Sequence, residues 1–202
     1  MKIRSDFILP ELKYKRILLK VSGEALAGDA YRGLDFTIVN ELCESIKTCV
    51  DMGVQIGLVI GAGNFWRGVK DGADKMQRSH ADSMGMLGTV MNAIAVADAL
   101  NRHGMDARVL SAVEMNKFAE YFTRDLAERY LNEGKVVLFA AGTGNPYFST
   151  DTGAVLRGVD ITAMALAMDN DMTMVCFGLN EENSIVRVVR GEEIGTTVKN
   201  HF

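Results

Sequence analysis

The chain has 202 residues, of which 48% are apolar and 24% charged, and its formal net charge is −4. This length is enough to bury a full hydrophobic core, and the composition is that of an ordinary soluble globular protein. Its 22 lysines and arginines form no cluster and only 7% of its residues are aromatic, which argues against a basic surface for non-specific nucleic-acid binding.

The first part of the chain predicts two strands separated by a helix. Residues 1–15 carry scattered charges and no sustained apolar stretch, so we expect neither a signal peptide nor a membrane span there. Residues 16–21 form an apolar run typical of a strand, and a turn follows at 22–26. Apolar residues then recur at helical spacing over 36–52, and residues 54–60 are typical of a second buried strand.

A long helix is predicted over residues 82–103, with an apolar stripe that includes several methionines. Such a stripe is more typical of a core or of a subunit contact than of a cofactor site. No apolar run in the sequence is expected to be long enough to cross a membrane. The stripe consists of Met84, Met86, Leu87, Val90, Met91, Ile94 and Ala97.

The remaining chain continues the alternation of strands and helices. Residues 184–189 are ambiguous, because their β-branched side chains favour a strand, whereas a helix capped at Asn183 or Ser184 and ended at Gly191 fits equally well. The other predicted elements are a strand at 107–110, a helix at 122–132, a strand at 136–140, a helix at 162–168 and a strand at 173–177.

This alternation predicts an α/β fold, a three-layer αβα sandwich with a mostly parallel sheet. No repeat or linker divides the chain, so we expect one domain over residues 1–202. Ligand-binding loops gather at the carboxyl ends of parallel strands. Three glycine-containing turns follow predicted strands: the first loop (residues 22–26), the second loop (61–68) and the third loop (141–151). We expect the three to converge on one cleft.

The third loop has the strongest signature of a binding site. Gly142 and Gly144 free the backbone to turn, and Pro146 fixes φ directly afterwards. The loop then supplies hydroxyls, an amide and backbone N–H groups before a short segment that suits a helix, and a helix N-terminus favours an anion. The alternative is a polar loop in which Ser149, Thr150 or Asp151 only caps that segment.

Several nucleotide-binding and hydrolytic motifs are excluded. The dinucleotide fingerprint needs glycine or alanine at its last position, where the second loop has Trp66 and the third has Tyr147. No Walker-type P-loop and no Ser/His/Asp or Cys/His set occurs. Lys20 and Arg67 remain as charges for a phosphate. Either could also be an ordinary surface residue, Lys20 by extending its charged end into solvent.

The three cysteines, Cys43, Cys49 and Cys176, lack metal-ligand spacing. We expect them to be buried and reduced, which suits a cytoplasmic protein.

Four motifs, in order along nearly the whole chain, resemble those of bacterial uridylate (UMP) kinases of the amino-acid kinase superfamily. Residues 15–26 resemble the first strand and loop of that family, and residues 61–68 resemble its second glycine loop. Residues 82–87 are similar to the start of its long helix, and residues 142–151 to its most diagnostic loop.

The resemblance implies transfer of the γ-phosphoryl group of ATP, bound with Mg²⁺, to UMP in pyrimidine nucleotide biosynthesis. It implies catalytic roles for Lys20, Arg67 and Asp151, although Asp151 could equally be a helix cap, and it identifies no metal ligand. It further implies a homohexamer, with GTP and UTP as effectors. The ATP site would comprise Lys20, Val21, Ser22, Gly23, Gly63 and Arg67, and the UMP site Ala62, Asp82, Thr143, Gly144, Asn145, Pro146, Tyr147, Phe148, Ser149 and Thr150.

One segment departs from the family pattern. Residues 157–161 run directly into Thr162, where the family carries several dozen more residues with contacts to ATP. A regulatory protein that binds UMP or UTP without catalysis is therefore a second hypothesis. A third is a relative acting on a carbamate or carboxylate, which residues 143–150 together with Asp82 argue against.

Overall fold

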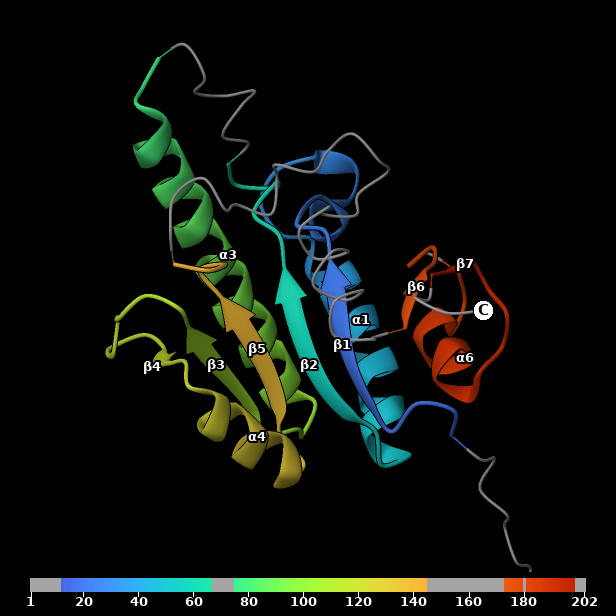
Figure 1. Cartoon of the computed structure of the whole chain (residues 1–202). Helices are drawn as coiled ribbons and strands as arrows, with labels where there is room; N and C mark the ends of the chain where they lie inside the picture. Colours follow the sequence, from blue (N-terminus) through green and yellow to red (C-terminus); the bar gives the residue numbers. More distant parts are fainter. Residues whose placement is uncertain (1–11, 67–74, 145–172, 180, 199–202) are drawn as a thin grey trace, which may run out of the picture.

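The computed structural model describes residues 12–66, 75–144, 173–179 and 181–198 (Figure 1). The predicted helix at 162–168 lies outside these residues. The elements are β1 (Arg16–Val21), η1 (Glu24–Ala30), α1 (Phe36–Asp51), β2 (Gln55–Ile60), α3 (Arg78–Arg102), β3 (Ala107–Ser111), β4 (Glu120–Tyr121), α4 (Arg124–Asn132), β5 (Val136–Ala140), β6 (Met174–Cys176), α6 (Ser184–Arg190) and β7 (Thr196–Val198).

A five-stranded parallel sheet occupies the centre, in the order β1-β2-β5-β3-β4. Strand β5 lies between two strands that precede it in the chain, with Leu138 beside Leu58 of β2 and Phe139 beside Leu110 of β3. Because the strands are parallel, their carboxyl ends share one edge of the sheet, the upper edge in Figure 1. The prediction of a mostly parallel sheet is confirmed.

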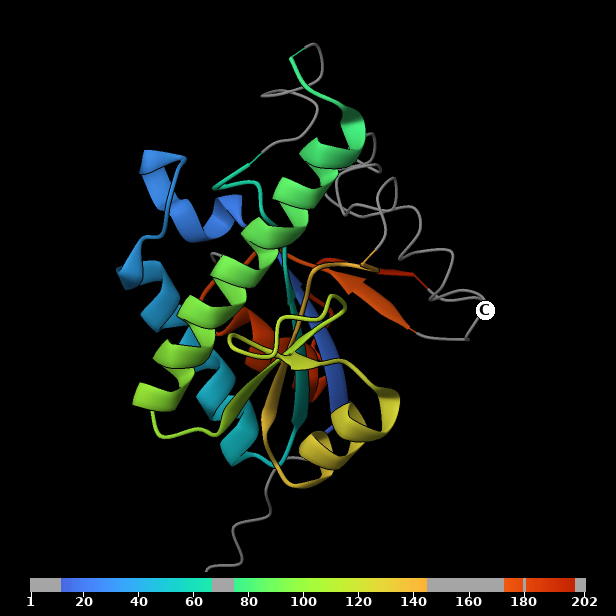
Figure 2. The same ribbon diagram turned by 90° about the vertical axis from the view of Figure 1, so that its left-hand side faces the viewer.

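Helices cover both faces of this sheet (Figure 2). On one face, Leu58 and Leu138 are fully buried together with side chains of α1 and α3. On the other face, Leu110 and Val137 are buried against Leu131 of α4. Alternate residues of each strand point to opposite faces, so the apolar runs supply two cores at once. The three-layer αβα arrangement is confirmed.

Side-chain caps mark the starts of α1 and α4. Asp35 accepts a hydrogen bond of 2.8 Å from the Thr37 N–H at the start of α1, and Thr123 accepts one of 3.2 Å from the Leu126 N–H at the start of α4. Helix α4 thus begins after Phe122, the predicted start. Helix α3 begins four residues before the predicted Asp82, and the predicted turn at 22–26 runs into the 3-10 helix η1.

Helix α3 is the described segment that bears on the expectation that no apolar run is long enough to cross a membrane. Its 25 residues are long and apolar enough by length and composition, but half of its most apolar stretch is buried inside the protein against the sheet. The apolar stripe also divides in two. Val90 and Ala97 are buried in the core, whereas an exposed apolar face is formed by Met84, Leu87, Met91 and Ile94.

The C-terminal segment differs most from the prediction. Strand β6 does not extend the central sheet but pairs antiparallel with β7, which the element-by-element prediction lacked. Residues 184–190 form helix α6, which packs against α1. Asn183 precedes it in the left-handed conformation, with no capping hydrogen bond from its side chain.

The cysteines are free thiols, but only two match the prediction. Cys43 and Cys49 are fully buried in the core, and burial raises the pKa of each thiol to about 11. Cys176, on the small sheet, is only half-buried.

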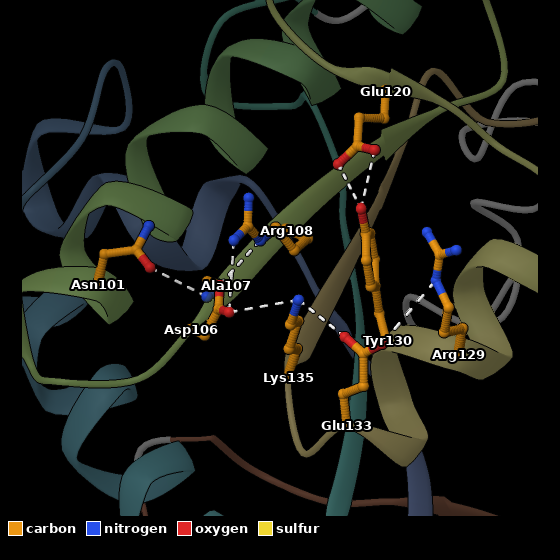
Figure 3. A network of polar contacts seen from close by, with 9 residues as sticks. All are labelled: Asn101, Asp106, Ala107, Arg108, Glu120, Arg129, Tyr130, Glu133 and Lys135. Atoms are coloured by element: carbon orange, nitrogen blue, oxygen red, sulfur yellow. Dashed lines mark hydrogen bonds and ion pairs between the residues drawn. The ribbon is translucent and has the colours of Figure 1, made fainter.

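A charged network around Tyr130 secures the edge of the sheet where β3 and β5 begin (Figure 3). The Tyr130 hydroxyl donates to both carboxylate oxygens of Glu120, at 2.9 and 2.8 Å, and Lys135 Nζ lies 4.6 Å from the ring centroid. Arg108 Nε donates to Asp106 Oδ1 at 2.8 Å. Although partial burial raises the pKa of Asp106, the hydrogen bond and charge of Arg108, aided by Lys135, bring it below its ordinary value.

Candidate active site

The first and second loops touch at the carboxyl ends of β1 and β2. The Gly61 N–H donates to the Val21 carbonyl at 2.9 Å, which continues the strand pairing into the loops. A Cβ at Gly23 would lie 2.4 Å from the Gly61 carbonyl oxygen and 2.5 Å from Asn64 Oδ1. Only glycine allows this approach, so Gly23 sets the distance between the two loops.

The second loop rests on α3. The N–H groups of Phe65 and Trp66 both donate to the Ala62 carbonyl at 2.9 Å, which makes a tight turn. A Cβ at Gly88 of α3 would lie 2.9 Å from the Ala62 Cβ, so the small residue on the helix allows the loop to approach. The loop's backbone N–H groups thus lie at the sheet edge beside the first loop.

The third loop begins after β5 and also contacts α3. Ala141 adopts a positive φ of 65°, and its N–H donates to the Thr89 hydroxyl at 2.8 Å. Gly144, at φ 76°, closes the turn through its N–H to the Ala141 carbonyl at 2.9 Å. Of the predicted UMP-binding residues in this loop, Thr143 and Gly144 are described, and Asn145–Thr150 lie outside the described residues.

Asp82 lies in the first turns of α3, on the side of the sheet where the three loops gather. Its side chain is 4% exposed, and Oδ1 accepts a hydrogen bond from Arg78 Nε at 2.8 Å. The ion pair fixes the orientation of the Asp82 carboxylate near the amino end of α3.

Lys20 is exposed and lies one residue before the end of β1, on the face of the sheet opposite Leu19 and Val21. Two residues later, the Ser22 hydroxyl accepts a hydrogen bond of 3.2 Å from the Glu24 N–H in the first loop. The two other predicted catalytic residues, Arg67 and Asp151, lie outside the described residues. Within the described parts of the chain, no three His, Cys, Asp or Glu side chains form a metal-binding group.

A model of the amino acid kinase family matches residues 15–173. The chain belongs to the amino acid kinase family. Family membership supports phosphoryl transfer as the class of reaction.

Two solved structures are similar to this amino acid kinase. UMP kinase from Bacillus anthracis superposes with a TM-score of 0.85 at 24% sequence identity, over 94% of this chain and 97% of that one. UMP kinase from Ureaplasma parvum superposes with a TM-score of 0.81 at 27% identity, over 93% and 99% of the two chains. At this identity the first of these matches supports the fold alone.

Sequence reasoning missed three buried polar residues of the site. Asn64, Thr89 and Asn92 are 2%, 6% and 0% exposed, and all three hydrogen-bond to the loops or to each other. Thr89 and Asn92 lie within the apolar pattern of α3, where a polar residue on a buried face is itself a signal.

Proposed function

We propose that this amino acid kinase is a UMP kinase, which transfers the γ-phosphoryl group of ATP to UMP and yields UDP and ADP. The observation that carries the proposal is the junction of the loops. Two glycine loops touch through Gly23 and Gly61, and the third is hydrogen-bonded to the helix that carries Asp82. This arrangement suits two phosphorylated ligands side by side, and the similarity to two UMP kinases supports the choice of acceptor. Such a role belongs to the cytoplasm and to pyrimidine nucleotide synthesis.

Catalysis in this proposal depends on alignment and charge rather than on covalent chemistry. Phosphoryl transfer needs the attacking and leaving oxygens in line and the charge of the equatorial oxygens neutralised. Lys20 would supply positive charge, and the N–H groups around Gly23 and Gly63 would hold phosphates that side chains would crowd. Asp82 would accept the ribose hydroxyls of UMP. Mg²⁺ would enter as part of the ATP complex, which is how phosphate-bound magnesium usually reaches kinase sites.

A coupled assay of ADP release tests the reaction, with UMP, CMP and carbamate offered in turn as acceptors. We expect turnover with UMP, and Asp82→Asn should raise the KM for UMP by about tenfold, because a charged acceptor is lost. Asp98→Asn is the matched control. Asp98 also forms an ion pair with an arginine of α3, Arg102, at 3.0 Å, but at the other end of the helix. Absence of transfer to UMP, or equal effects of the two substitutions, would contradict the proposal.

The regulatory alternative rests on the short sequence after Leu156, where the family's ATP contacts are expected. Calorimetric titration separates the two functions. UMP binding together with binding of a non-hydrolysable ATP analogue supports the kinase. UMP binding without any affinity for the analogue supports a protein that senses the nucleotide.

For the assembly, we propose that the exposed face of α3 packs against a second copy of the chain within a homohexamer. Met84, Leu87, Met91 and Ile94 are 39–55% exposed and recur along one side of the helix. Such a continuous apolar face is costly in water. Light scattering should give a mass several times that of the 22.1 kDa chain, and Met91→Glu should lower it. A monomeric parent protein would exclude this assembly.

A further inference from the structure

The geometry points to Thr89 and Asn92 of α3 as positioning residues that hold the third and second loops in place for the two ligands. The inference rests on the proposed function, because it assigns the third loop to UMP and the second to both ligands. It concerns two side chains one helical turn apart on a buried face of the helix, neither of which is expected to touch a substrate.

Asn92 is fully buried and pairs with Asn64 through both amides. Asn92 Nδ2 donates to Asn64 Oδ1 at 2.7 Å, and Asn64 Nδ2 donates to Asn92 Oδ1 at 2.9 Å. The second N–H of Asn92 donates to the Gly61 carbonyl at 2.7 Å, and that of Asn64 to the Gly33 carbonyl at 2.7 Å. All four amide hydrogens have acceptors, so this buried pair is satisfied and has one preferred geometry.

The amide pair fixes the junction of the first and second loops. Asn92 donates hydrogen bonds to the Gly61 carbonyl and to Asn64 Oδ1. These are the two atoms that a Cβ on Gly23 would meet at the shortest distances. A shift of either atom therefore changes the distance between the two loops. Removing the Asn92 amide would leave the Gly61 carbonyl and the Asn64 amide without their buried partners.

Thr89 performs the corresponding task for the third loop. Its hydroxyl donates to the Met86 carbonyl at 2.6 Å and accepts from the Ala141 N–H at 2.8 Å. Ala141 has φ 65°, a left-handed conformation that is unfavourable for an alanine. The hydrogen bond from the Ala141 N–H to the Thr89 hydroxyl thus stabilises an unfavourable backbone conformation at the residue where the third loop leaves the sheet.

Because each residue contacts a different loop, the two are expected to have separable effects. Thr89→Val keeps the shape of the side chain but removes the hydroxyl. It should weaken UMP binding by roughly tenfold, about 1.4 kcal/mol, and leave the Kd of a non-hydrolysable ATP analogue unchanged. Thr89→Ser restores the hydroxyl and should return the UMP Kd to near the parent value. Asn92→Leu should weaken both ligands.

The matched control is Thr48→Val in α1. The Thr48 hydroxyl also donates to a helix carbonyl, that of Glu44 at 3.0 Å, but it is exposed and has no hydrogen bond to the described residues of the three loops. Trp66, the only tryptophan in the chain, provides an independent readout because it lies in the second loop. Its fluorescence should shift in Asn92→Leu and stay unchanged in Thr89→Val, whereas a general loss of packing would alter both.

Calorimetry with UMP and with the ATP analogue decides the matter on the full-length protein. Selective loss of UMP affinity in Thr89→Val, restored in Thr89→Ser, supports the inference. An unchanged UMP Kd in Thr89→Val, or equal weakening of both ligands, overturns it. A parent protein that binds no UMP would instead refute the proposed function and this inference together, so the two failures are distinguishable. The decision rests on the Thr89 variants, which remain informative if Asn92→Leu does not fold.

Discussion

Replacing Gly23 by alanine should separate the first two loops while leaving the backbone conformation acceptable. Gly23 has φ −58° and ψ −33°, which any residue adopts, so the whole cost is steric. The new Cβ would lie 2.4 Å from the Gly61 carbonyl oxygen, and restoring a contact of about 3.4 Å would move that atom by about 1 Å. Overpacking of this kind costs about 1–3 kcal/mol, partly offset by a gain of about 0.4–1 kcal/mol from the stiffer unfolded chain.

The effect on catalysis should exceed the effect on stability. A misplacement of about 1 Å in an aligned site costs on the order of 100-fold in rate. We therefore expect kcat for UMP phosphorylation to fall about 100-fold in Gly23→Ala, with Tm lowered by roughly 2–8 °C. The coupled assay and a thermal melt measure the two. Gly178→Ala is the control, because among the described residues its Cβ would meet only Glu181, at 3.6 Å. Parental kcat and Tm in Gly23→Ala would refute the steric argument.

Three further predictions concern charge and thiol chemistry. Lys20→Met should lower kcat in the coupled assay by about 100-fold or more, because the proposed mechanism uses the positive charge of Lys20 to stabilise the transferring group. An unchanged rate would remove Lys20 from the site. With pKa values of about 11, Cys43 and Cys49 stay protonated at mildly alkaline pH, so a thiol reagent should label Cys176 first, and Cys176→Ser should abolish the fast phase. Because the pKa of Asp106 is lowered in the folded protein, its ion pair stabilises the fold above the pKa of the unfolded chain and is lost as pH falls. Asp106→Asn should therefore lower Tm at neutral pH, and a difference from the parent that persists in acid would contradict this assignment.

Strand β5 could be predicted because it is buried on both faces, and an apolar run such as 136–140 has few alternatives to a central parallel strand. The bounds of 16–21 were also predicted correctly, although β1 is an edge strand on which Arg16, Leu18 and Lys20 are exposed. Strand β6 could not be assigned to its sheet in this way, because its three half-buried residues show only that it is a strand. Strand β6 pairs with β7, and the three residues of β7, Thr196–Val198, are too few to show a hydrophobic pattern that predicts a strand.

The residues of the candidate site also differ in how far they could be predicted from the sequence. Gly23 and Asp82 belong to local motifs, so the sequence predicted their involvement, and the structure gives each a definite neighbour. The partners of Thr89 and Asn92 are 52 and 28 residues away in the chain. Such long-range hydrogen bonds follow from the packing of α3 on the sheet edge, which local spacing does not reveal.

The position of β5 between β2 and β3 has a consequence for synthesis of the chain on the ribosome. Residues 55–60 and 107–111 are made first, yet neither strand can pair with the other, because β5 separates them. Until Val136–Ala140 emerge, both strands have an open edge that can pair with another nascent chain. A fragment that ends before Val136 should therefore aggregate, whereas chains that extend past the third loop can close the sheet.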